Sequence, residues 1–168
     1  MLFILCRSIN KHMDFKLFLE NSEEYLSDIK KTLGKIPKEH ANLIKKYKIK
    51  FEPENTLKND SGHVGFIDEE NKIIRVAAPW NYSRGFTFLH EVAHAVWKYK
   101  MSSEQKKEWS ELLKITKESQ KKNVSSKSKN SLNQNSEEIF CMAYASKYSK
   151  HPVVTYNNKK WIGFIDKI

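Results

Sequence analysis

The sequence has little cysteine and no long hydrophobic run. Its two cysteines, Cys6 and Cys141, lie far apart and outside any CxxC pair, which argues against a disulfide scaffold and against a cysteine zinc site. We expect free thiols, with Cys141 as a small buried hydrophobic residue. The apolar start, MLFILC, is too short for a signal-peptide core or a membrane span, so we expect a cytoplasmic protein that does not span a membrane.

Arginine is also scarce, although the net charge is +10. Most of the cations are lysines scattered among Glu, Asn and Ile, whereas bidentate contacts to bases and phosphates favour arginine. This pattern, without a patch of arginine and aromatic residues, argues against a specific nucleic-acid partner. A length of 168 residues, with 39% hydrophobic and 12% aromatic content, is typical of a single globular domain.

The spacing of apolar residues predicts how the chain is organised. We expect a partly disordered N-terminal extension at residues 1–20, followed by one α+β domain at 21–168 with a flexible polar loop at about 118–136. A short strand is expected at 49–51, and VGFID and KIIRVAA predict a β-hairpin around the polar turn 69–71. Helical periodicity predicts helices near 21–34, 37–47, 86–97, 102–113 and 136–148, and a short helix in the segment ending WIGFIDKI.

The stretch TFLHEVAHAVW carries an HExxH motif. On a helix, His90 and His94 project from the same side, one turn apart, so both imidazoles can reach one zinc ion at about 2.0–2.1 Å. Glu91 lies about 100° further round, close enough to act as general base on a water at the zinc without becoming a ligand. The apolar face, which is expected to pack on the core, is formed by Phe86, Leu89, Ala93 and Val96. The alternative is a helix whose histidines face solvent or hydrogen-bond within the core.

A catalytic zinc site needs a third protein ligand. The chain offers many carboxylates and the histidines His12, His40, His63 and His151. Glu138 is the strongest candidate, because it lies on a helical stripe of small or apolar residues, Cys141, Met142 and Ala145, that can pack on another helix. An unpaired carboxylate is unfavourable in such an interface, and zinc would resolve that. Glu137 points about 100° away and can hydrogen-bond a ligand histidine. The alternative is that both glutamates only stabilise the helix N-terminus.

The segment FLHEVAHAVW followed by NSEEIFCMAYASKY resembles the Glu-zincin arrangement, in which HExxH precedes a helix with the pattern ExxxxxF/Y. The chain is specifically similar to the anthrax-lethal-factor-like peptidase domain, a family that includes the Pro-Pro endopeptidases. The similarity extends upstream to IPKEHANLIKKYKIKFEP and VGFIDEENKIIRVAA and covers residues 36–168.

This resemblance implies a zincin-like α+β fold, with a small mixed β-sheet and hairpin packed on the active-site helix and a following helix that bears a glutamate ligand. It also implies zinc on His90, His94 and Glu138, with Glu91 as general base. A substrate peptide is expected along the strand near residues 73–77.

The chain departs from this family at two positions. The family often has a tyrosine seven residues before the ligand glutamate, where its hydroxyl stabilises the oxyanion, and this chain has Ser131 there. Either Tyr144, Tyr148 or His63 substitutes, or the activity is low. Met142 stands where the family commonly has a second acidic residue.

The resulting expectation is a monomeric zinc metalloendopeptidase that hydrolyses a peptide bond in a protein or peptide substrate. One alternative is a zincin-like binding module that keeps zinc but cleaves weakly or not at all, which the missing tyrosine supports. Another is a regulatory metallopeptidase that cleaves repressors, because RGFTFLHEVAHAVW also resembles the active-site helix of that group. Those enzymes usually carry a Glu-x-x-Ala-Asn segment, which SEEIFCMAY lacks.

Overall fold

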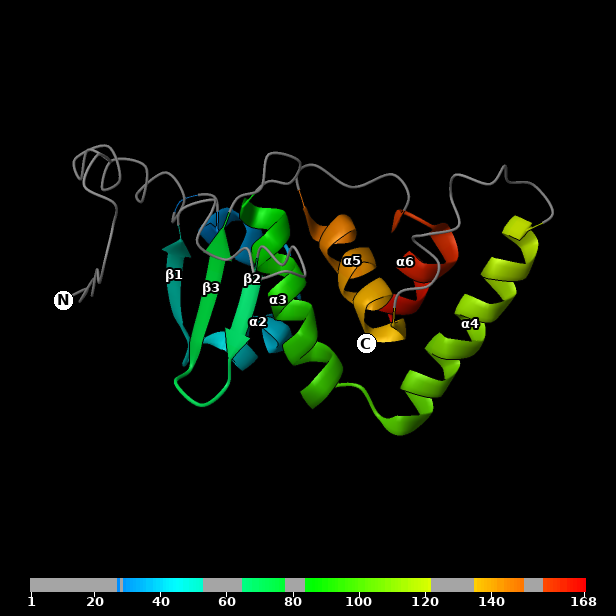
Figure 1. The fold of residues 1–168 in the computed structure, drawn as a ribbon, viewed down its shortest axis with the longest axis horizontal. Coiled ribbons are helices and arrows are strands. Elements are labelled where there is room, and N and C mark those ends of the chain that lie inside the picture. Colours follow the sequence, from blue (N-terminus) through cyan, green and yellow to red (C-terminus); the bar gives the residue numbers. More distant parts are fainter. Residues whose placement is uncertain (1–26, 28, 53–64, 78–83, 122–134, 150–155) are drawn as a thin grey trace.

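The computed structural model describes residues 27, 29–52, 65–77, 84–121, 135–149 and 156–168 (Figure 1). It has the expected mixed α+β composition. Helical residues 29–33 come first and end at a turn in which the Gly34 amide donates to the Lys30 carbonyl at 3.2 Å. The elements that follow are α2 (Lys38–Ile44), β1 (Lys48–Glu52), β2 (Gly65–Asp68), β3 (Ile73–Ala77), α3 (Arg84–Tyr99), α4 (Ser103–Lys121), α5 (Ser136–Tyr148) and α6 (Lys159–Ile165). The expected N-terminal extension lies outside the described residues.

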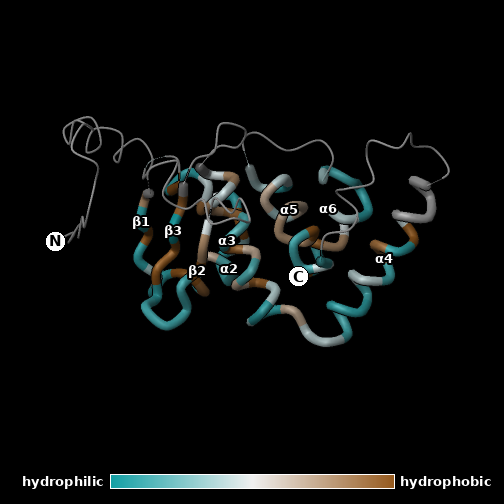
Figure 2. The backbone as a smooth tube through the Cα atoms, viewed as in Figure 1, coloured by the Kyte–Doolittle hydropathy of each residue, from teal (hydrophilic) through white to brown (hydrophobic). Residues whose placement is uncertain are grey.

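The sheet has three strands in the order β1-β3-β2. β2 and β3 form the predicted antiparallel hairpin, and β1 pairs parallel to β3. The turn between β2 and β3 is hydrophilic (Figure 2), and Asp68 stabilises it by accepting hydrogen bonds from the backbone and side-chain amides of Asn71, both at 2.9 Å. Because β3 is paired on both sides, the expectation that a peptide lies along residues 73–77 is wrong.

Helix α3 lies between the sheet and α5, and it contacts β2, β3 and α2 as well as α5 (Figure 1). The predicted core face is confirmed, since Phe86, Leu89, Ala93 and Val96 are all buried. Burial extends further round the helix than the sequence pattern indicated, because Phe88, Val92 and Ala95 are also buried. The histidines His90 and His94 lie on the stripe that stays partly accessible.

Helix α4 begins with the capping box that the sequence predicts. The Ser102 amide donates to the Gln105 side chain at 2.8 Å, and the Gln105 amide donates to the Ser102 hydroxyl at 3.2 Å. The helix continues to Lys121, so the start of the polar loop expected at residue 118 is wrong. Glu, Gln and Lys extend an existing helix readily, and extension fixes only one residue for each new hydrogen bond. The middle of that loop lies outside the described residues.

Helices α5 and α6 complete the domain beside α4 (Figure 1). Both start at asparagine caps, where Asn135 accepts from the Glu137 amide and Asn158 accepts from the Lys160 amide. α5 begins at the residue that the sequence predicts. Among the described helices, none has both the length and the hydrophobicity needed to cross a bilayer.

Candidate metal centre

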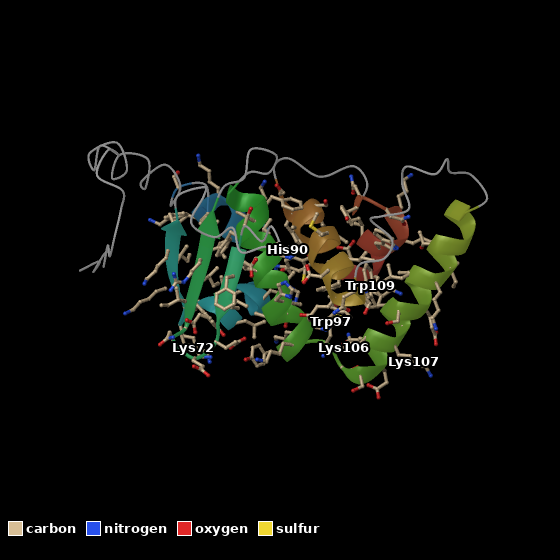
Figure 3. All side chains as sticks on the ribbon, viewed as in Figure 1. Lys72, His90, Trp97, Lys106, Lys107 and Trp109 are labelled. Atoms are coloured by element: carbon tan, nitrogen blue, oxygen red, sulfur yellow. The ribbon has the colours of Figure 1, made fainter. Side chains whose placement is uncertain are left out.

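The two motif histidines lie next to each other on α3, and both contact Glu138 of α5; Figure 3 labels His90. Their ring centroids are 5.0 Å apart, and the rings are nearly perpendicular. A spacing of four residues in a helix produces this pairing, because such residues share one face. His90 and His94 are both partly buried, so their ring nitrogens are accessible at the edge of the core.

Glu138 on α5 reaches both histidines. Its Oε2 is 3.2 Å from His90 Nε2, and its Oε1 is 3.6 Å from His94 Nε2. Donor atoms arranged tetrahedrally at about 2.0–2.3 Å from a zinc ion lie about 3.3–3.8 Å from one another. The spacing of these nitrogen and oxygen donors therefore fits a divalent cation held between α3 and α5.

Glu137 contacts the other ring nitrogen of His94. Its Oε1 lies 2.8 Å from His94 Nδ1, as expected for a carboxylate that orients a ligand histidine. A neutral His94 that donates from Nδ1 to Glu137 has its acceptor lone pair on Nε2, the nitrogen that faces Glu138. The two consecutive glutamates of α5 thus contact opposite nitrogens of one imidazole.

Glu91 points toward the sheet and lies against Gly65, the first residue of β2. Only 5% of Glu91 is exposed. A Cβ atom built on Gly65 would lie 2.2 Å from Glu91 Oε1 and 2.8 Å from its Cδ. A side chain at position 65 would therefore displace the carboxylate. Sequence reasoning missed this contact, although a glycine inside a strand is a known signal of close approach.

The environment of Glu91 favours its protonated form. Burial is the larger cause and the negative charge of Glu138 is the second, and together they raise the pKa of Glu91 to about 8. A cation held by His90, His94 and Glu138 would act in the opposite direction, because a positive charge favours the carboxylate. A carboxyl group with a pKa near neutrality can both accept and return a proton.

Cys141 is a second candidate for the third ligand. It is fully buried on α5, and ligand atoms of His90, His94 and Cys141 all lie within 4.8 Å of one another. The oxygens of Glu138 lie closer to the histidine nitrogens, at 3.2 and 3.6 Å, so Glu138 is the better placed of the two candidates. Burial, and then the charges of Glu138, Glu137 and Glu91, raise the pKa of the Cys141 thiol well above its usual range. Without metal the sulfur is a thiol.

The two tyrosines that were candidates for the oxyanion donor do not face this site. Tyr144 is fully buried, and its hydroxyl lies 3.0 Å from Nδ1 of His40, whose Nε2 is 3.1 Å from the Ile168 carbonyl. Tyr148 follows Glu138 by ten residues, about 15 Å along the helix axis. Both assignments are therefore unsupported, and His40 is excluded as the third ligand by its own partners.

Four other residues considered from the sequence lie in segments that the structure does not describe. His63, the remaining candidate for the oxyanion donor, lies outside the described residues. The same holds for Ser131 and for the alternative ligands His12 and His151.

The N-terminus of α5, which carries both glutamates, is fixed by Trp109 of α4 (Figure 3). The indole Nε1 of Trp109 donates to the Ser136 carbonyl at 2.8 Å. Its ring packs perpendicular to the ring of Phe140, with centroids 5.5 Å apart. The ring of Trp97, on α3, also packs on Phe140, with centroids 5.3 Å apart. The aromatic cluster connects α3 and α4 to the first turn of α5, from which Glu137 and Glu138 project.

Comparison with known proteins finds no match: no family model, no curated protein and no solved structure is similar to this chain. The family resemblance therefore rests on the sequence motifs alone.

Proposed function

We propose that the protein is a zinc-dependent metalloendopeptidase of the lethal-factor-like zincin type, acting on a protein or peptide substrate. The observation that carries the proposal is the convergence of His90 Nε2 and His94 Nε2 on the two oxygens of Glu138. Glu91 follows His90 directly but turns toward Gly65 instead of joining this group. Three ligands and a separate carboxylate are the parts that metal-assisted hydrolysis needs.

Each residue has a separate role in the proposed reaction. His90, His94 and Glu138 would hold zinc, which when bound supplies a Lewis acid that polarises the scissile carbonyl and acidifies water. Glu91 takes the proton from the attacking water and returns it to the leaving amine. Glu137 keeps His94 in the orientation in which Nε2 faces the site.

The outer edge of β2 supports a binding site for an extended peptide. In the sheet order β1-β3-β2, β2 is an edge strand that pairs only with β3 among the described strands. Backbone groups at such an edge can hydrogen-bond an added strand. Because Gly65 touches Glu91, a peptide paired with β2 would pass beside the proposed general base. Phe66 on the same strand is 54% exposed and offers an apolar contact.

A zincin-like binding module is the second candidate. Its support is the position of Tyr144, whose hydroxyl is committed to His40 and not to the site. Loss of an oxyanion donor reduces the rate by about 10²–10³ where this has been measured. A protein with intact ligands and no such donor would retain zinc but cleave slowly or not at all.

Zinc content and peptide cleavage distinguish these functions. The purified protein is expected to hold about one zinc per chain and to cut members of a peptide library in a chelator-sensitive manner. Glu91→Gln should keep zinc and lose cleavage, whereas His94→Ala should lose both. Glu111→Gln, on the exposed face of α4, is the matched control and should change neither.

Three results would each decide against one part of this proposal. Protein that binds no zinc would refute the metal site, and full zinc occupancy without any cleavage would favour the binding module. Cleavage that persists in Glu91→Gln would remove Glu91 from the reaction.

A further inference from the structure

The sulfur of Cys141 lies in the same group of donors as the motif histidines. Its Sγ and one nitrogen from each of His90 and His94 are all within 4.8 Å of one another. Donors around a tetrahedral zinc lie about 3.3–3.8 Å apart, so even the upper limit of 4.8 Å exceeds that spacing by only about 1.0–1.5 Å. Cys141 is a free thiol and is fully buried.

The surroundings of this sulfur differ from those of a cysteine in an apolar core. Cys141 is one turn along α5 from Glu138, on the face that packs against α3. The carboxylate of Glu138 and the nitrogens of His90 and His94 meet at the same place as this sulfur. A cation at this point would offer the thiol a bond partner.

We propose that Cys141 is a fourth protein ligand of the metal, beside His90, His94 and Glu138. This inference rests on the proposed metal site and adds a ligand to it. On binding, the S–H bond breaks, its proton passes to solvent, and the thiolate bonds to the ion in place of a water molecule.

Four protein ligands define a closed coordination sphere, which is typical of structural zinc sites, while catalytic sites keep an open position. In the proposed resting state the sulfur occupies the position that the attacking water needs. Peptide hydrolysis then requires Cys141 to leave the metal, and a variant without the sulfur has a permanently open site. The thiolate also favours thiophilic ions over Mg²⁺ and Ca²⁺.

Cobalt substitution tests the proposal on the full chain without measuring activity. Co²⁺ bound to His and Glu gives visible d–d bands, and a thiolate ligand adds a charge-transfer band in the near ultraviolet. Wild type and Cys6→Ser should show both kinds of band. Cys141→Ser should keep the visible bands and lose the ultraviolet band. Since the chain has two cysteines, Cys6→Ser is the matched control.

Each result of this experiment has a defined meaning. Visible bands without the ultraviolet band in wild type would overturn the Cys141 assignment and leave the metal site standing. Loss of the ultraviolet band in Cys6→Ser would also overturn it. Absence of all cobalt bands would refute the metal site itself. If Cys141→Ser does not fold, the spectra of wild type and Cys6→Ser still decide the matter.

Discussion

Replacement of Gly65 by alanine would place a methyl group on the proposed general base. The new Cβ would lie 2.2 Å from Glu91 Oε1, 2.8 Å from Cδ and 2.9 Å from Cγ. Contacts of this length are not tolerated, so either the carboxylate or the strand has to move by about 1 Å to restore ordinary van der Waals separation. Glu91 is only 5% exposed, which leaves the side chain little free space.

The two ways of relieving this clash have different consequences. If the carboxylate moves, a displacement of about 1 Å reduces the cleavage rate by about 10²-fold. If β2 moves instead, overpacking destabilises the protein by about 1–3 kcal/mol. Glycine to alanine in a strand would otherwise stabilise the protein by about 0.4–1 kcal/mol, because the unfolded chain loses freedom. The clash therefore determines whether the substitution stabilises or destabilises the protein.

Urea unfolding, zinc content and cleavage rate measured on the same preparation separate these effects. Zinc content should stay at the wild-type level, because the three atoms nearest to the new Cβ all belong to Glu91, which is not a proposed ligand. Gly163→Ala is the matched control, since a Cβ there meets nothing within 4 Å and α6 should gain about 0.5–1 kcal/mol. Wild-type rate together with unchanged or increased stability in Gly65→Ala would refute the contact between β2 and Glu91.

Further predictions concern the glutamates and Tyr144. In metal-free protein, burial raises the pKa of Glu91 from 4.5 to about 8. The stability that protonated Glu91 contributes is therefore fully present below its unfolded pKa of 4.5 and is lost as pH rises through about 8. The stability of Glu91→Gln relative to wild type should therefore rise with pH across that range in urea titrations, and parallel curves would contradict the burial of Glu91. Glu137→Gln should weaken zinc binding about 10–100-fold in chelator competition, because it alters the partner of His94 Nδ1; unchanged affinity would remove this role. Tyr144→Phe should reduce the free energy of unfolding by about 0.5–1.5 kcal/mol through the lost bond to His40, with zinc content unchanged; loss of zinc would instead connect Tyr144 to the site.

The parts of the site that were predictable from sequence depend on local geometry. The placement of His90 and His94 on one face follows from the helix period alone. The contact of Glu138 with these histidines could be predicted only by assuming that the helix face bearing Glu138 packs on another helix. That face belongs to α5, and α5 packs on α3. The hairpin was readable because two alternating segments flank a polar turn.

The missed features all depend on how separate elements meet. The position of β3 between β1 and β2 depends on parallel pairing across a connection that no local pattern encodes. The approach of Gly65 to Glu91 and of Cys141 to the histidines depends on the rotation of each element about its axis. The hydroxyl of Tyr144 bonds to His40, which is distant in sequence, so its orientation could not be inferred from the spacing to Glu138.

The division of the site between two pairs of elements has a consequence for its behaviour. The proposed ligands come from α3 and α5, whereas the proposed base contacts β2. Trp109 fixes the ligand-bearing end of α5 through Ser136, on the side of the domain away from the sheet. Metal affinity should therefore respond to changes in the aromatic cluster, and catalysis should respond to changes at the edge of the sheet. Variants of the two regions act on different steps, so their effects on zinc binding and on cleavage should be separable.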